Sequence, residues 1–134
     1  MLETIIKEIE NCIGTDDFEC VMEENIMKLE MQDVGIEAVE PLLQLMERHP
    51  LADFGVPGAI VHFVERFYKR GYEQLLMESV KKRPTMHTVW MLNRIINGSE
   101  NKEDYIKIML DIMNSTEIEV EIRELAKSLR GGNL

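Results

Sequence analysis

The sequence predicts an all-α protein of about eight helices, stacked as antiparallel hairpins. Apolar residues recur at intervals of three and four through nearly the whole chain, which is the spacing of a helix with one buried side. No alternating apolar and polar run indicates a strand, and 4 prolines and 8 glycines are too few for a turn-rich β protein. The 10 methionines suit a helical core packed with flexible side chains. The length fits one domain over residues 1–134.

The first half of the chain predicts helices over 2–13, 18–33, 36–49 and 56–71. Gly14 closes the first helix, and Thr15 to Asp17 offer N-caps for the second. The third helix stops before Pro50, because the residue before a proline avoids the helical conformation. The fourth has Pro57 in its first turn, where a missing amide is tolerated, and ends at Gly71.

The second half predicts helices over 72–83, 86–98, 105–113 and 116–129. Thr85 caps the second of these helices, which ends at Gly98. Ser115 or Thr116 caps the last one. We expect residues 131–134 to fray as a tail.

Two segments of the chain resemble each other and indicate an internal repeat. EPLLQLMERHP, residues 40–50, can be laid over EQLLMESVKKRP, residues 73–84, and a helix that ends in glycine follows each. The units start near Gly35, Gly71 and Asn101, 36 and 30 residues apart. This spacing is typical of stacked helical hairpins, so we predict repeat-like hairpins over 35–130.

The repeat resembles the HEAT type, in which a helical hairpin opens with a proline-leucine-leucine helix. Pro41, Leu42 and Leu43 match that opening. Gln74 takes the place of the proline in the next unit, and the match is good over 35–98 and weak beyond. The resemblance implies an α-α superhelix in which the proline-bearing helix lies in the outer layer.

Small acidic HEAT-like chains also resemble the α-helical immunity proteins of bacterial contact-dependent inhibition and other polymorphic toxin systems. The run TVWMLNRIIN, residues 88–97, is similar to the central hydrophobic helix of that group. The resemblance implies a protein that binds and neutralises a cognate toxin.

The net charge of −10 is concentrated in the first third of the chain. Residues 1–50 hold 13 acidic and 3 basic side chains, whereas the charges of residues 51–134 balance. Such a field repels nucleic acid and anionic membranes and favours a basic protein partner. At 100° per residue, a stripe of acids follows one side of the helix over 18–33 and continues beyond it: Asp16, Glu19, Glu23, Glu30, Asp33 and Glu37. We predict that this stripe binds the partner; the alternative is a face kept acidic for solubility.

Trp90 and Arg94 are weaker candidates for the same interface. The indole of Trp90 either anchors the core between hairpins or contributes to binding, as buried aromatic residues often do at interfaces. Polar neighbours on the same helix could edge such a surface.

The basic residues Lys69, Arg70, Lys81, Lys82 and Arg83 form one cluster in the sequence. With Tyr68 and Tyr72 beside them, they could bind single-stranded nucleic acid by stacking on bases. The alternative, which we prefer, is that they stabilise the C-terminal ends of two helices.

No catalytic, cofactor or metal site is predicted. The chain has no phosphate-binding glycine loop, no H-E-x-x-H and no G-x-S-x-G motif. His62 and Glu65 are three residues apart, but a zinc site needs at least three protein ligands. Cys12 and Cys20 are expected to be reduced and mostly buried, with a disulfide as the alternative.

We therefore predict a non-catalytic immunity protein that binds a basic toxin domain, such as a nuclease, through an acidic surface. The alternative is a cytosolic HEAT-like adaptor or assembly factor that binds another protein. The first residues lack the pattern of a signal peptide, and no apolar run is long enough for a membrane span, so we expect a cytoplasmic protein. We expect it to be a monomer or a weak dimer.

Overall fold

The structure, a computed structural model, describes residues 1–55 and 58–131. These residues form eight α-helices, one 3₁₀ turn and no strand, so the predicted all-α class is confirmed. The helices are α1 (Leu2–Asn11), α2 (Phe18–Met31), α3 (Val39–Arg48), α4 (Ala59–Glu65), α5 (Tyr72–Lys82), α6 (Met86–Gly98), α7 (Glu103–Asn114) and α8 (Val120–Gly131). None of them is long and apolar enough to cross a membrane.

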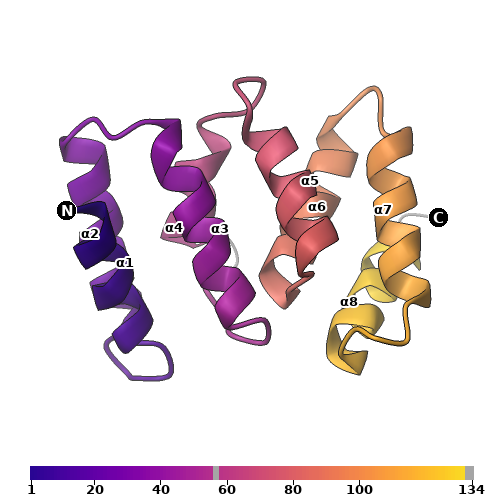
Figure 1. Ribbon diagram of the computed structural model, residues 1–134, viewed down its shortest axis with the longest axis horizontal. Helices are drawn as coiled ribbons and strands as arrows, with labels where there is room; N and C mark the ends of the chain where they lie inside the picture. Colours follow the sequence, from indigo (N-terminus) through magenta and orange to yellow (C-terminus); the bar gives the residue numbers. More distant parts are fainter. Residues whose placement is uncertain (56–57, 132–134) are drawn as a thin grey trace.

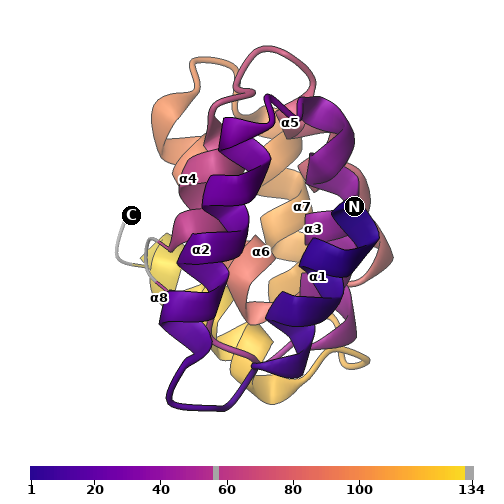
Figure 2. The same cartoon turned by 90° about the vertical axis from the view of Figure 1, so that its left-hand side faces the viewer.

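The helices pair as hairpins that stand side by side in a row (Figure 1). Helices α1, α3, α5 and α7 form a first layer, in which each contacts the next. Helices α2, α4, α6 and α8 form the second layer, which lies beside the first when the row is viewed from its N-terminal end (Figure 2). The apolar stripes of both layers meet between them in one continuous core.

Pro41 lies in the first turn of α3, where a proline is tolerated. The 3₁₀ turn η1 (Ile36–Ala38) precedes the helix, so Pro41 is its third residue. The first amides of an α-helix have no partner within the helix, and the amide that proline lacks is one of these. The proline therefore helps to start α3 instead of breaking it.

Helix α4 is shorter than predicted because the chain turns back before Gly71. Residues 66–71 form tight turns, in which Lys69 takes a positive φ of 63° and Gly71 one of 114°. The Lys69 amide donates to the carboxylate of Glu73, which fixes this turn on the first residues of α5. The predicted start of this helix at Val56 and Pro57 lies outside the described residues.

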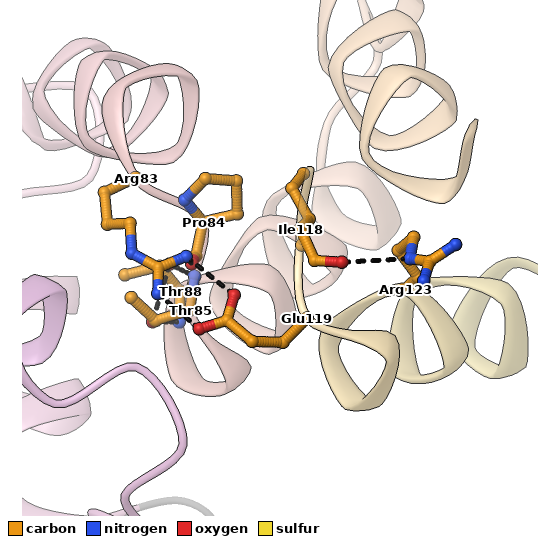
Figure 3. Close-up of polar contacts among 7 residues, drawn as sticks. All are labelled: Arg83, Pro84, Thr85, Thr88, Ile118, Glu119 and Arg123. Carbon is orange, nitrogen blue, oxygen red and sulfur yellow. Dashed lines mark hydrogen bonds and ion pairs between the residues drawn. The ribbon is translucent and has the colours of Figure 1, made fainter. Parts of the chain in front are cut away.

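The start of α8 differs from the prediction for a tertiary reason. Ser115 accepts a hydrogen bond from the Glu117 amide, and Thr116 lies in the same turn, so neither caps the helix. The carbonyl of Glu119 accepts from the amides of Ile122 and Arg123 in α8, while its carboxylate is held by both terminal nitrogens of Arg83 after the end of α5 (Figure 3). A long-range ion pair therefore holds the residue that precedes α8. The frayed tail that we predicted is outside the described residues from 132 onward.

The predicted N-cap of α6 is confirmed. The Thr85 side chain accepts a hydrogen bond from the Thr88 amide, and the Thr88 hydroxyl accepts one from the Thr85 amide, which together make a capping box (Figure 3). Both threonines are buried, so these bonds satisfy amides that water cannot reach.

Hydrogen bonds and ion pairs join successive helices within each layer. In the second layer an arginine reaches back to an acceptor on the preceding helix three times: Arg66 to Glu30, Arg94 to Glu65 and Arg130 to Asn93. In the first layer Arg48 binds Glu10, and Lys82 binds Glu47. Hydrogen bonds from Arg48 lower the pKa of Glu10 to about 2. These contacts fix the register of neighbouring hairpins on top of the apolar core.

Candidate protein-binding site

An acidic groove of about 680 Å³ lies between the first two hairpins and is lined by the α1–α2 turn, α2, the α3–α4 loop and α4. The turn contributes Asp16, and the first turns of α2 contribute Glu19 and Glu23. Asp53 of the α3–α4 loop and His62 of α4 lie on the opposite side. We call this feature the acidic groove and define it by these five residues together with Phe18, Met22 and Phe54.

Aromatic side chains form the floor of the groove. Phe54 is 1% exposed, and its ring lies edge-on to Phe18 of α2 at 5.8 Å between centroids. On its other side Phe54 meets the ring of His87 in α6 at 5.6 Å. The Pro50 carbonyl accepts a hydrogen bond of 2.8 Å from the Met86 amide. The α3–α4 loop thus contacts both α2 and the start of α6, and these contacts fix the position of Asp53.

A glycine is required at the end of this loop. A Cβ atom on Gly58 would lie 2.0 Å from the Phe54 carbonyl oxygen, so any other residue would force the backbone to shift. At the near end of the loop, the Gly55 amide donates to the Asp53 carboxylate at 2.8 Å. The chain therefore approaches itself closely beneath the groove.

The groove carries negative charge without a lysine or arginine to offset it. Four carboxylates line it, and its only basic side chain among the described residues is His62. The other described hollows of the surface each include a lysine or an arginine. Asp16, Glu19 and Glu23 are exposed and have no hydrogen-bond or ion-pair partner within the described part of the chain. These three acids, which the sequence predicted together, do gather in space.

The rest of the predicted acidic stripe does not continue the groove. Glu30 forms an ion pair with Arg66 at 3.4 Å, so it is not the uncompensated charge that we expected. Glu37 accepts a hydrogen bond from the Gly35 amide at 3.1 Å, and Asp33 is exposed in the turn after α2 with a φ of 55°. Asp16 precedes α2 and is not on its helical face, although it lies in the groove.

Arg94 and Trp90 lie outside the groove, in a contact between α4 and α6. The guanidinium of Arg94 donates to both oxygens of Glu65 at 2.7 and 2.8 Å and lies 5.0 Å from the centre of the Trp90 ring. Burial by itself would raise the pKa of Glu65. Hydrogen bonds from Arg94 and Tyr68 outweigh this effect and hold the pKa below its usual value. Trp90 is half-buried and packs against the core. Arg94 is therefore already engaged within the fold.

The basic cluster of the sequence is divided in space. Lys69 and Arg70 precede α5, whereas Lys81, Lys82 and Arg83 are at its other end, and the 11 residues of α5 separate them by roughly 16 Å. Lys82 pairs with Glu47 at 3.6 Å, and Arg83 pairs with Glu119. Tyr72 is fully buried and cannot stack on a base. The alternative in which this basic cluster and both tyrosines form one surface for single-stranded nucleic acid is therefore wrong.

The described residues contain no group of three or more histidine, cysteine or acidic side chains that could hold a metal ion. Glu65, the partner considered for His62, is occupied by Arg94. Both cysteines are free. The expectation that they are mostly buried is wrong, because Cys20 is exposed on α2 and Cys12 is only half-buried.

Sequence reasoning missed the other side of the groove. Asp53 and Phe54 belong to a loop without helical periodicity, so no pattern joined them to α2. A lone phenylalanine between Asp53 and Gly55 was the available signal, since a large aromatic side chain in a polar loop is usually buried against something.

Comparison of the chain with models of protein families, with curated proteins and with solved structures finds no match in any of the three. The acidic groove and the fold that presents it therefore carry the functional proposal.

Proposed function

We propose that this protein is a non-catalytic inhibitor that binds a basic partner protein in the acidic groove, and that the partner is a toxin domain which it neutralises. The observation that carries the proposal is the convergence of four carboxylates, without lysine or arginine, on a concave surface with an aromatic floor. The resemblance to immunity proteins supplies the kind of partner, and the groove supplies the chemistry by which that partner is bound.

Cationic side chains suit this site for two physical reasons. Uncompensated carboxylates attract a basic surface at long range and raise the association rate. At contact, a guanidinium can donate hydrogen bonds to the carboxylates of Glu19 and Glu23 while its flat face packs on an aromatic ring such as Phe18. A nuclease must hold phosphate in a basic cleft, so a protein that covers the cleft with carboxylates competes directly with the substrate.

The first test is genetic. The reading frame next to the gene is expressed in a host that lacks this protein, and growth is followed with and without co-expression of the protein. We expect growth arrest that co-expression relieves. A neighbouring product that leaves growth unaffected would count against the toxin, although the binding groove could still serve another partner.

The second test measures the groove itself. Glu19→Lys with Glu23→Lys reverses two of its carboxylates, and Glu103→Lys with Glu121→Lys makes the same change in net charge at two exposed positions of the last hairpin. Calorimetric titration with the partner at several salt concentrations should show a loss of about 100-fold or more for the groove variant, at roughly 1 to 3 kcal/mol per reversed contact. The control should stay within about threefold, because distant charges are screened. Equal losses in the two variants would refute a specific role for the groove.

The same titration separates this proposal from the adaptor alternative. An adaptor that buries mainly apolar surface would bind with little dependence on salt, whereas the groove requires affinity to fall steeply as salt rises.

A further inference from the structure

Helix α2 keeps two large apolar side chains outside the core. Met27 is 57% exposed and Met31 is 80% exposed, and neither is among the described apolar residues that form the core or pack against it. They fall roughly 150° around the helix from its buried residues Met22, Ile26 and Leu29. One exposed apolar side chain is ordinary, but these two are four residues apart and therefore adjacent on one face. We call Met27 and Met31 the methionine strip.

No described element covers the methionine strip. Helix α2 is the first helix of its layer, and its packing partners are α1 and α4. Its remaining side is open when the row is viewed from its N-terminal end (Figure 2). Cys20 is exposed on nearly the same line of α2, two turns before Met27. The open line from Cys20 to Met31 is roughly 16 Å long, which is the length of three turns of a helix lying alongside.

Acidic side chains border the methionine strip on both sides. Glu23, which also lines the acidic groove, falls roughly 40° from Met27 on the side of α4. Glu24 falls roughly 20° from Met31 on the opposite side. Both glutamates are exposed and have no hydrogen-bond or ion-pair partner within the described part of the chain. The strip is therefore an apolar surface between two uncompensated negative edges, and it is continuous with the acidic groove through Glu23.

The charge at this surface decides which kind of molecule can cover it. Lys28 of α2 and Arg66 after α4 already pair with Glu8 and Glu30, so they do not neutralise the edges of the strip. A second copy placed face to face would bring like charges together, and an anionic membrane would meet the same repulsion. The complementary occupant has an apolar centre and cationic edges.

We propose that the methionine strip receives an amphipathic helix of the basic partner. Apolar side chains of that helix pack on Met27 and Met31, while its lysines or arginines reach Glu23 and Glu24. Methionine suits this contact because its flexible, polarisable side chain adapts to different apolar shapes, and a helix laid along an apolar surface is a common form of recognition. The inference rests on the proposed function and adds the structural element by which the partner docks beside the groove.

A synthetic peptide of leucine and lysine, with leucines at helical spacing i, i+3, i+4 and i+7, is the probe for this surface. The protein is labelled with carbon-13 in its methionine methyl groups, and each signal is assigned by a Met→Leu substitution. Titration should shift the Met27 and Met31 signals until the site is saturated, while those of the buried Met46, Met91 and Met109 stay in place. A peptide of the same composition, reordered so that no apolar helical face forms, controls for attraction by charge alone.

Met27→Gln with Met31→Gln removes the apolar surface and keeps the net charge and the helix propensity. Fluorescence anisotropy of the labelled peptide should show affinity at least about tenfold weaker, with an unchanged dependence on salt. The matched control is Leu110→Gln with Val120→Gln, which replaces two residues of the last hairpin that are 47% and 53% exposed. The control should bind within about threefold of the wild type, and circular dichroism melts verify that both variants are folded.

Three results would overturn the inference, and each leaves the proposed function to its own tests. If the methionine variant binds the peptide as tightly as the wild type while Glu19→Lys with Glu23→Lys weakens binding, the acidic groove acts without the strip. If the reordered peptide shifts the two methyl signals equally, or no peptide binds, the occupant is not an amphipathic helix. If these signals shift with protein concentration alone, a second copy covers the strip. The toxin itself is decided by the growth experiment, which does not depend on the peptide.

Discussion

His87 gives the structure a defined dependence on acid. Its side chain is 4% exposed, lies between the rings of Phe54 and Trp90, and has no hydrogen-bond partner for Nε2 among the described residues. Burial lowers the pKa of His87 from 6.5 to about 4, and the nearby charge of Asp53 opposes this only in part. The folded protein therefore keeps this ring neutral, whereas the unfolded chain takes up a proton as the pH falls below about 6.5.

The sign of the effect follows from proton uptake. Between pH 6.5 and pH 4 the unfolded state binds one more proton at this site than the folded state, so acid favours unfolding. At about 1.4 kcal/mol per pH unit, the free energy of unfolding should fall by about 2 kcal/mol from pH 7 to pH 5 and by about 3 kcal/mol at pH 4. The contribution is fully present above pH 7 and is lost on acidification.

The perturbation is His87→Phe, which keeps a ring between Phe54 and Trp90 but removes the titrating nitrogen. Urea unfolding followed by circular dichroism gives the free energy of unfolding of both proteins from pH 7 to pH 4. The larger ring can change stability by about 1 kcal/mol at every pH, so the informative quantity is the difference between the two curves. Other groups, such as the Glu10 carboxylate held by Arg48, contribute equally to both proteins and cancel. Parallel curves over this range would refute the assignment of the acid sensitivity to His87.

Substitution of one proline and one glycine tests how the start of α3 and the end of the α3–α4 loop are formed. Pro41→Ala should leave the helical circular dichroism signal unchanged and lower the free energy of unfolding by no more than about 1 kcal/mol. Alanine fits the same position in α3, but it gives the unfolded chain more conformational freedom than proline does. A collapse of helicity would show that the proline is needed to form α3. Gly58→Ala should cost about 1 to 3 kcal/mol in urea unfolding, since its Cβ would meet the Phe54 carbonyl at 2.0 Å. It should also weaken partner binding through the displaced Asp53, and an unchanged affinity would mean that the loop does not position the groove.

The sequence was sufficient for the elements because helices are local objects. The apolar period, the glycines and prolines at the ends, and the Thr85 cap are all properties of a few neighbouring residues, and they predicted eight helices in the right order. The helix ends that were predicted wrongly have local and distant causes. Helix α4 ends early in a local turn, where the Lys69 amide donates to Glu73. Before α8, by contrast, the carboxylate of Glu119 is held by Arg83, 36 residues earlier.

The candidate site likewise has features that the local sequence predicts and features that depend on distant residues. One turn of helix brings Glu19 and Glu23 to one side of α2, and periodicity alone predicts this. Whether a charge stays free is decided by what the next helix presents: Arg66 neutralises Glu30, and Glu65 engages Arg94. Asp53 and Phe54 line the groove because Phe54 packs against residues of α2 and α6, and no local sequence pattern encodes these contacts. The sequence by itself determined the helices and the location of the negative charge along the chain, since both are sums over neighbouring residues. Only the tertiary structure decided which acids are paired and where a groove opens, because these depend on side chains brought together from helices about 30 or more residues apart.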